Sequence, residues 1–284
     1  MSSSIHFLNT GNSDCIILES NGHFAMIDAA EDTDYPPDKP HLKLKGYEDE
    51  VCSYLLKNCA DENGIVTLEF ILGTHCHSDH IGGFDTVINH PNIIVKKAFL
   101  KPYYEKNIFI MERKRWDNKE VYLQMKNALD ENHITIVEDF DNLKIKLCEF
   151  DITFFNGSYK KPKMKFGENV NSVVTLVERN GLKALLAGDM NYKNGGEKLI
   201  ADKVGKVDLL KVGHHGYVGS TSFDFIKKLK PEYAIICNSS SRVYPDVRFK
   251  LKHISKSKVY CTVDCDGVKA VFKEKIYISG NIMD

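Results

Sequence analysis

The chain has 284 residues, of which 43% are hydrophobic and 27% are charged, as in an ordinary globular protein. Its 38 basic and 39 acidic residues give a formal net charge of −1, which excludes a global electrostatic attraction to nucleic acid or to anionic membranes. No apolar run approaches the roughly 18 residues of a membrane span, and the opening MSSSIHF lacks the basic and apolar regions of a signal peptide. The eight cysteines are scattered without a CxxC pair, which favours reduced thiols in a cytoplasmic protein.

Short apolar strands and helical patterns alternate in the first half of the chain. Asn21-Gly22 is a strong signal for a two-residue turn between strands, whereas the proline-rich segment 31–45 predicts an irregular excursion. The dense apolar run Val66–Gly73 is typical of a strand that is covered on both faces. The expected elements are, in chain order, strands at 5–9, 14–19 and 24–28, a helix at 47–59, strands at 66–73 and 93–100, one long helix at 111–132, and strands at 134–138, 143–149 and 151–156.

A lysine-rich loop at 159–167 leads into the second half, where Asn180-Gly181 predicts a hairpin turn. The order of elements favours two βαβ-rich halves that pack sheet on sheet with helices outside, which is an α/β fold. No segment is long or polar enough to be a linker, so we expect a single domain over residues 1–284. The elements expected here are strands at 172–178 and 182–187, a helix at 196–203, a strand at 207–212, a helix at 221–229, a strand at 233–237, a helix at 247–254, and strands at 259–263, 268–273 and 276–279.

The strongest chemical signal follows strand 66–73, where the chain reads THCHSDHIGG over residues 74–83. Side chains two apart in an extended chain point the same way, so His75 and His77 can bind one metal ion together. Asp79 and His80 lie beyond a turn and can reach a second ion nearby. Imidazole and carboxylate groups are the ligands of zinc in open catalytic sites, so the spacing indicates a site for two Zn²⁺ ions. Manganese or iron would fit the same set of nitrogen and oxygen ligands.

Two later strands end in residues of the same kind. An apolar run ends in Gly188-Asp189, and a carboxylate there is suited to bridge two metal ions. Another apolar run ends in His214-His215. We assign His214 as a metal ligand and give His215 an outer or substrate-contacting role, although the sequence distinguishes the two histidines only weakly.

The set HxHxDH with Gly-Gly, then a strand-end Gly-Asp, then a strand-end His-His-Gly resembles the metallo-β-lactamase superfamily. The resemblance covers most of the chain and implies a four-layer αβ/βα sandwich. Most members of that family place a further histidine before the strand that leads to the Gly-Asp, whereas this chain has Asn171 there. The difference disfavours a lactamase or thioesterase activity, and it leaves open whether one metal ion or two are bound.

Within that superfamily the chain resembles two kinds of hydrolase. The run 169–172, Asn-Val-Asn-Ser, and the run 211–216, Lys-Val-Gly-His-His-Gly, are similar to the hydrolase domain of bacterial competence channels. The N-terminal strands and the run 115–118, Arg-Trp-Asp-Asn, are similar to the catalytic domain of phosphorylcholine esterases. The second likeness spans nearly the whole chain, although the choline-binding repeats of those enzymes are absent.

These resemblances imply a zinc-dependent phosphoesterase, in particular a phosphodiesterase, whose nucleophile is a metal-bound hydroxide. Its substrates would be small phosphoesters, with phosphorylcholine esters as the leading example. Asp79 and His215 are the expected catalytic residues, the first to position the nucleophile and the second to protonate the leaving oxygen or hydrogen-bond the phosphate. Trp116 offers an aromatic face for a choline cation, and Asn171 and Tyr217 are further expected substrate contacts.

Two other functions are compatible with the sequence. One is a metal-dependent nuclease in which the lysines of loop 159–167 hold a nucleic-acid backbone. The near-zero net charge counts against this function. The other is a metal-binding module without catalysis, and the complete ligand set from His75 to His80 counts against it.

Overall fold

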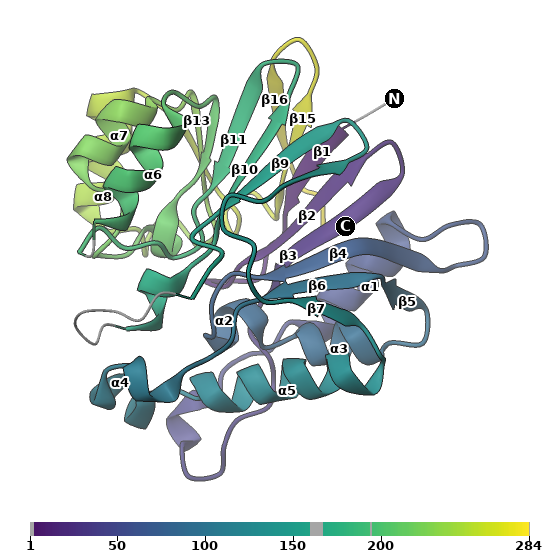
Figure 1. Ribbon diagram of the computed structural model, residues 1–284. Helices are drawn as coiled ribbons and strands as arrows, with labels where there is room; N and C mark the ends of the chain where they lie inside the picture. Colours follow the sequence, from purple (N-terminus) through teal and green to yellow (C-terminus); the bar gives the residue numbers. More distant parts are fainter. Residues whose placement is uncertain (1–2, 160–166, 194, 284) are drawn as a thin grey trace.

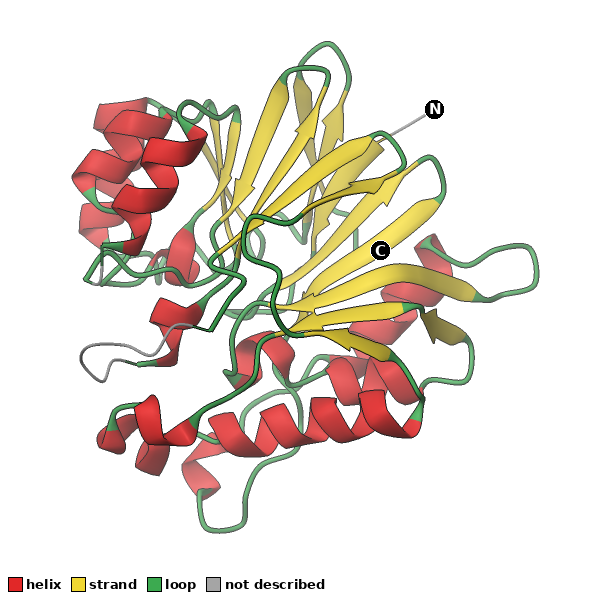
Figure 2. Ribbon diagram, in the orientation of Figure 1, coloured by secondary structure: helices red, strands yellow, loops and turns green. Residues whose placement is uncertain are grey.

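The computed structural model describes residues 3–159, 167–193 and 195–283. Two β-sheets pack face to face at the centre, and helices cover both outer faces (Figures 1 and 2). The four-layer αβ/βα sandwich predicted from the sequence is therefore confirmed. Within the described residues, no helix is both long enough and apolar enough to cross a lipid bilayer.

The first sheet combines the N-terminal strands with the last two strands of the chain. Its order is β16-β15-β1-β2-β3-β4-β6-β7, and β5 pairs with β4 outside this path. The pairs from β3 through β4 and β6 to β7 are parallel, so these strands end at a common edge. The strands are β1 (Ser3–Phe7), β2 (Cys15–Ser20), β3 (His23–Ala29), β4 (Val66–Gly73), β5 (Ile93–Val95), β6 (Lys97–Leu100), β7 (Thr135–Val137), β15 (Val268–Phe272) and β16 (Ile276–Gly280).

The second sheet has the order β14-β13-β12-β11-β10-β9-β8. Strands β11 to β14 are parallel, and β8 to β11 are antiparallel. The strands are β8 (Lys144–Leu147), β9 (Phe150–Phe155), β10 (Val174–Arg179), β11 (Leu182–Leu186), β12 (Leu209–Lys211), β13 (Tyr233–Ile236) and β14 (Lys258–Cys261).

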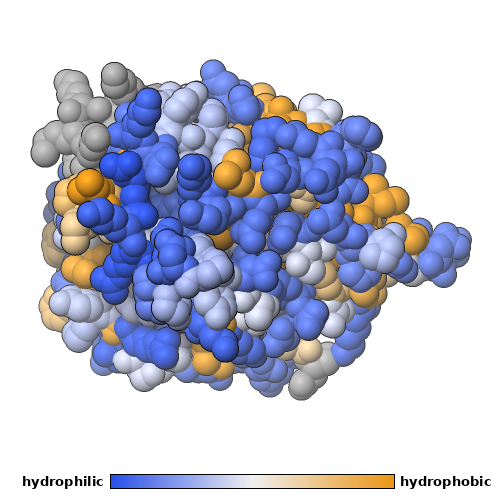
Figure 3. All heavy atoms as spheres, turned by 90° about the horizontal axis from the view of Figure 1, so that it is seen from below, coloured by the Kyte–Doolittle hydropathy of each residue, from blue (hydrophilic) through white to orange (hydrophobic). Residues whose placement is uncertain are grey.

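Helices line the two outer faces of the sandwich (Figure 1). Helices α1, α3 and α5 contribute to the apolar cluster on the first sheet, and α6, α7 and α8 contribute to the one on the second. The face seen in Figure 3 is mostly hydrophilic, as expected for helices that bury one side only. The helices are α1 (Glu48–Asn58), α2 (Ser78–Ile81), α3 (Phe84–Asn89), α4 (Ile110–Arg115), α5 (Asn118–Glu131), α6 (Gly196–Val204), α7 (Phe223–Leu229) and α8 (Pro245–Lys250).

Side chains on the central strands alternate between two apolar cores. On β2, Ile16 and Leu18 join the core between the sheets, whereas Cys15 and Ile17 join the core under the first helix layer. This period of two is the geometric property of an extended strand. A strand that must bury both faces needs apolar residues at every position, which explains the unbroken apolar runs in the sequence.

A bulge in β4 sets the direction in which the chain enters the His-rich segment. Phe24 of β3 pairs with Leu68, but Met26 pairs with Ile71, so β4 contains one extra residue. Leu68 packs toward the helices, whereas Phe70 and Leu72 pack between the sheets. The bulge thus reverses which residues face inward just before the strand ends, as bulges beside functional sites often do.

Two expected elements are each divided in the structure. The strand expected over 93–100 forms β5 and β6, which are separated at Lys96. The long helix expected over 111–132 forms α4 and α5, because Trp116 takes an extended conformation (φ −110°, ψ 166°) and a new helix begins after Asp117. Asp117 precedes the first turn of α5, but its side chain makes no capping hydrogen bond, so the break does not depend on a local cap. The break leaves Trp116 beside the functional site described below.

We expect Phe154→Ala to lower the free energy of unfolding by about 3–5 kcal/mol. Phe154 is fully buried between the sheets. Its ring centroid lies 4.9 Å from that of Phe99 and 5.5 Å from that of Phe140. Urea denaturation followed by circular dichroism measures the loss, with Phe249→Ala, at a residue 57% exposed, as the control. Equal losses in the two variants would contradict this account of the core.

Candidate metal centre

The residues expected to bind metal lie where strands of both sheets end, beside α2 (Figure 1). The segment that follows β4 meets the segments that follow β11 and β12 at this edge. One backbone hydrogen bond joins the two sheets here, from Val173 N–H, before β10, to the carbonyl of Thr74, after β4 (2.9 Å). Within the first half, Asp14 N–H donates to the carbonyl of Asp79 (3.0 Å) and holds α2 against the start of β2. The site is therefore built on the junction of the two halves of the fold.

Two glycines allow the His-rich segment to fold tightly. A Cβ on Gly82 would lie 2.6 Å from the carbonyl oxygen of Ser78, and one on Gly83 would lie 2.5 Å from that of Ala29. Real Cβ atoms do not approach backbone oxygens so closely, so only glycine fits at either position. Helix α2 can therefore turn back against the end of β3, which brings Asp79 and His80 toward the strand ends.

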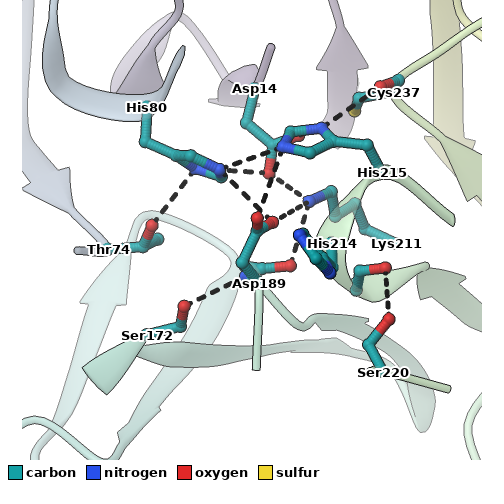
Figure 4. A network of polar contacts seen from close by, with 12 residues as sticks. Asp14, Thr74, His80, Ser172, Asp189, Lys211, His214, His215, Ser220 and Cys237 are labelled. Carbon is teal, nitrogen blue, oxygen red and sulfur yellow. Dashed lines mark hydrogen bonds and ion pairs between the residues drawn. The ribbon is translucent and has the colours of Figure 1, made fainter. Parts of the chain in front are cut away.

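Four side chains bring their ligand atoms together at the centre of the site. His80 Nε2 lies 3.1 Å from His215 Nε2 and 3.3 Å from Asp189 Oδ1. His215 Nε2 lies 3.2 Å from Asp79 Oδ2 and 3.5 Å from Asp189 Oδ2. In Figure 4 the rings of His80 and His215 face Asp189 from two different elements.

This donor set fits a metal ion. A zinc ion lies about 2.0–2.2 Å from each nitrogen or oxygen ligand, so ligands of one ion are roughly 3–3.5 Å apart. Asp189 Oδ1 is also buried without a hydrogen-bond partner, which is costly for a carboxylate that has no cation beside it. Two groups, Asp79–His80–His215 and His75–His80–Asp189, each have all their candidate ligand atoms within 4.8 Å of one another.

A third group of this kind, Asp14–Asp28–His80, is largely engaged by protein donors, and only Asp14 Oδ1 in it is buried without a hydrogen-bond partner. Asp28 accepts the backbone N–H of Thr74 (2.8 Å) and the Thr74 hydroxyl (2.7 Å). It also pairs with His80 Nδ1 at 2.7 Å. Asp14 is ion-paired with the buried ammonium of Lys211. We interpret these two carboxylates as supports of the ligands, because carboxylates behind metal-binding histidines fix the ring and its tautomer.

The His75–His77 pair forms a less complete half of the site. His75 Nε2 lies 3.1 Å from His77 Nδ1, a separation that one ion could span. His77 is not part of any compact three-residue group in the described part of the chain. Its Nε2 donates to the Glu112 carboxylate on α4 (3.1 Å). Asn171, which was expected to contact substrate, donates its amide to Glu168 (2.9 Å) and lines a separate small cavity.

The positions of His214 and His215, which follow β12, favour roles opposite to those assigned from the sequence. Both have left-handed backbones, with φ of 52° at His214 and 49° at His215. This tight turn directs His215 into the buried cluster, whereas His214 Nδ1 donates to the carbonyl of Val218 (2.9 Å). His214 instead lines the cleft above the cluster. Left-handed conformations cost non-glycine residues about 1–3 kcal/mol each and are found mainly at functional sites.

The buried carboxylates of the cluster raise the pKa of two of its histidines. Burial would lower the pKa of His80 and of His215, but the negative charge of Asp189 and of neighbouring carboxylates outweighs burial and raises both values. Burial and the adjacent histidines lower the pKa of His75 well below its usual range. The carboxylates thus favour positive charge between them, which a divalent metal ion would supply in place of the protons.

Above the cluster lies an open cleft of about 480 Å³. Trp116 and Tyr217 form part of its wall, so two of the expected substrate contacts do border the site. Lys193 is the sole lysine or arginine among the described residues of the wall. The acidic side chains of the wall are Glu31, Asp79, Glu112, Asp117 and Asp189.

One of these acids, Glu31, has a strongly shifted pKa. Burial and the charge of Asp79 raise the pKa of Glu31 to about 9. The lysines at 160, 161, 163 and 165 lie outside the described residues.

Sequence reasoning did not identify Asp14, Asp28, Glu112 and Lys211 as parts of the site. Lys211 gave one usable signal, because a charged residue within an apolar strand, LLKV, needs a buried partner. The ammonium of Lys211 pairs with Asp14, donates to the carbonyl of Gly188 (3.1 Å), and lies 3.9 Å from Asp189 Oδ1. The partner of this lysine lies 197 positions earlier in the chain, beyond the reach of any local pattern.

We expect Lys211→Met to destabilise the metal-free protein by about 3–5 kcal/mol, because Asp14 would be left as an uncompensated buried charge. Urea denaturation measures the loss, and Lys227→Met on the exposed face of α7 is the control. The double variant Asp14→Leu/Lys211→Met should recover much of the stability, since neither charge then remains. A loss in Lys211→Met no greater than in the control would show that the pair does not stabilise the fold.

Comparison with known proteins agrees with this architecture. Residues 8–239 match the sequence model of the metallo-beta-lactamase superfamily. "ComE operon protein 3" of Bacillus subtilis (strain 168) is 30% identical over 185 residues, which are 64% of this chain and 21% of that protein. "Recombination protein 2" of Haemophilus influenzae (strain ATCC 51907 / DSM 11121 / KW20 / Rd) is 29% identical over 208 residues, 72% of this chain and 21% of that protein. The matched part of the chain thus spans about a fifth of the length of these relatives.

Among solved structures, the metallo-beta-lactamase fold protein YhfI from Bacillus subtilis superposes with a TM-score of 0.52. The superposition covers 92% of this chain and 96% of YhfI at 10% identity, so it speaks for the fold alone. The predicted family and the predicted likeness to competence proteins are confirmed. Because the family model matches well over half of its residues, the chain belongs to the metallo-β-lactamase superfamily.

Proposed function

We propose that this chain is a metal-dependent hydrolase of phosphoric esters, in particular of phosphodiesters. The observation that carries the proposal is the convergence of Asp79, His80, Asp189 and His215 at the floor of an open cleft. Family membership supports a metal-dependent hydrolase. The phosphoric ester rests on the asparagine variant of the motif and on the chemistry of the cleft.

Each residue of the cluster has a proposed role. His80, His215 and Asp79 would hold one metal ion, His75 and His77 would hold a second, and Asp189 would bridge the two. Bound at this centre, the ions would supply an activated water and stabilise negative charge on a phosphoryl group. With His215 proposed as a ligand, His214 and Tyr217 on the cleft wall become the candidates for contact with the phosphate or the leaving oxygen.

The two metal positions are proposed to differ in affinity. The position at His80 and His215 draws on four nearby ligand atoms, and its histidines have buried acceptors behind them. The position at His75 and His77 lacks a third histidine, because the Asn171 amide is engaged by Glu168. Zinc is the proposed metal from the ligand types, and manganese or iron would suit the same donors.

The wall of the cleft favours a small substrate over a long polyanion. Lys193 is the sole lysine or arginine among its described residues, so beyond the metal ions a nucleic-acid backbone would find few cationic contacts. Trp116 would provide an aromatic face to a cationic substituent such as choline, although the Arg115 guanidinium lies 5.0 Å from the centre of its ring. A phosphorylcholine ester is therefore the leading substrate class.

A nuclease is the second proposed function, and the printed names of two relatives favour it. One is called a recombination protein and another a competence protein, and these names support DNA as a substrate to be tested. Those names belong to proteins several times longer than the matched segment. A phosphodiester linkage is common to both proposals, so the two differ in the group attached to the phosphate rather than in the bond that is hydrolysed.

The ligand assignment predicts opposite results for the two adjacent histidines. His215→Ala and Asp189→Ala should each remove bound metal and lower hydrolysis of bis-p-nitrophenyl phosphate by at least about 10²-fold, because both are proposed to hold the ions. His214→Ala should keep the metal content of the unmodified chain. Metal analysis and initial rates measure the two effects. Full metal content in His215→Ala together with loss in His214→Ala would reverse the assignment.

The substrate assignment is tested with three phosphodiesters at equal concentration. We expect turnover of p-nitrophenyl-phosphorylcholine to exceed that of bis-p-nitrophenyl phosphate, and Trp116→Ala to reduce this preference by roughly 3–30-fold, which corresponds to about 0.5–2 kcal/mol of cation–π interaction. Single-stranded DNA should be cut slowly, if at all. Fast cleavage of DNA that is lost in Asp189→Ala, with no preference for the choline ester, would instead establish the nuclease.

A further inference from the structure

Glu112 is a partly buried carboxylate on α4 that the proposed chemistry does not use. It lies in the segment between β6 and α5, and its side chain is 14% exposed. A single oxygen, Oε1, accepts three hydrogen bonds. The donors are His77 Nε2 (3.1 Å), Asn118 Nδ2 (3.0 Å) and the backbone N–H of Glu168 (2.7 Å).

The three donors come from three separate parts of the chain. His77 belongs to the His-rich segment, Asn118 begins α5, and Glu168 begins the short 3-10 helix 168–171. Glycine at 167 makes room for the carboxylate, since a Cβ there would lie 2.3 Å from Glu112 Oε2. Glu112 is therefore held in place from several sides before any metal ion binds, so its position relative to His77 is fixed by the fold.

This contact fixes the tautomer of His77. An ionised carboxylate can only accept hydrogen bonds, so the proton of the neutral ring is on Nε2. The lone pair is then on Nδ1, the atom that lies 3.1 Å from His75 Nε2. A carboxylate behind a metal-binding histidine also increases the basicity of the ligand atom, and loss of such a partner typically lowers metal affinity 10–100-fold.

We propose that Glu112 is a positioning residue that sets the affinity of the metal position formed by His75 and His77. The proposal rests on the metal centre proposed above. His80 has Asp28 behind it at 2.7 Å, and His215 has the carbonyl of Cys237 at 3.3 Å. Glu112 is the corresponding partner of His77. Its contribution is greatest at this position because Asn171 supplies no third imidazole there.

Cobalt(II) titration of the metal-free protein tests the proposal without any substrate. The unmodified chain should bind two equivalents with different affinities, each with its own visible absorption. Glu112→Ala should weaken one equivalent 10–100-fold and change its absorption, while the other equivalent is unaffected. Glu112→Gln keeps an acceptor oxygen but loses the charge, so its cobalt affinity should lie between that of the unmodified chain and that of Glu112→Ala. Glu105→Gln is the matched control, because Glu105 lies in the same segment, has a side chain that is 45% exposed, and pairs with Lys119 at 3.9 Å.

Three results would overturn the proposal. Unchanged binding of both equivalents in Glu112→Ala would show that the carboxylate does not act on His77. Equal weakening of both, with a lower midpoint of thermal unfolding, would show that Glu112 only ties α4 to its neighbours. Binding of fewer than two equivalents by the unmodified chain would remove the position that Glu112 is proposed to serve. If the unmodified chain bound no cobalt at all, the proposed metal centre itself would be wrong. In the first two results the unmodified chain still binds two equivalents, so those results count against the role of Glu112 alone.

Discussion

Three carboxylates, those of Asp14, Asp28 and Asp189, are almost completely buried at the edge where the two sheets meet. Buried charge is tolerated only where it is paired and hydrogen-bonded. Lys211 meets Asp14, Thr74 and His80 meet Asp28, and the two histidines meet Asp189. The need to compensate these charges explains why the segments after β4, β11 and β12 all approach the same point.

The three carboxylates are not compensated equally, and the difference indicates which of them can bind metal. Asp28 and one oxygen of Asp14 have strong donors that belong to the protein, Thr74 and Lys211, which suits both residues to a supporting role, although the second oxygen of Asp14 has no hydrogen-bond partner. Asp189 Oδ1 has no hydrogen-bond donor within the described structure, and its closest basic groups are imidazoles that can themselves bind metal. A carboxylate with one unpaired oxygen beside two imidazole rings is suited to bind a metal cation. The same burial that makes the site costly for the fold makes its electrostatic effect strong.

Much of the fold could be predicted from periodicity and turn residues, because buried strands need unbroken apolar runs and tight turns need residues such as Asn21-Gly22. The His-rich segment was recognisable because all its members lie within six positions. The left-handed backbone at His214 and His215 directs His215 rather than His214 into the cluster. It has no local sequence signal, since neither residue is glycine. The pairing of Lys211 with Asp14 depends on contact between distant segments. The break at Trp116 reflects a choice between one long helix and two short ones that tertiary packing decides.

Strand β1 (Ser3–Phe7) lies between β2 and β15 (Val268–Phe272), so the beginning of the chain pairs with a segment more than 260 positions away. During synthesis the early strands are present long before β15 leaves the ribosome. The edge of β1 that β15 later covers would meanwhile expose unpaired backbone groups, a common starting point for aggregation. Closure of such long-range pairs is also slow, because a large loop must be ordered first. Pairing with β15 thus removes an edge of β1 that would otherwise stay open to other chains.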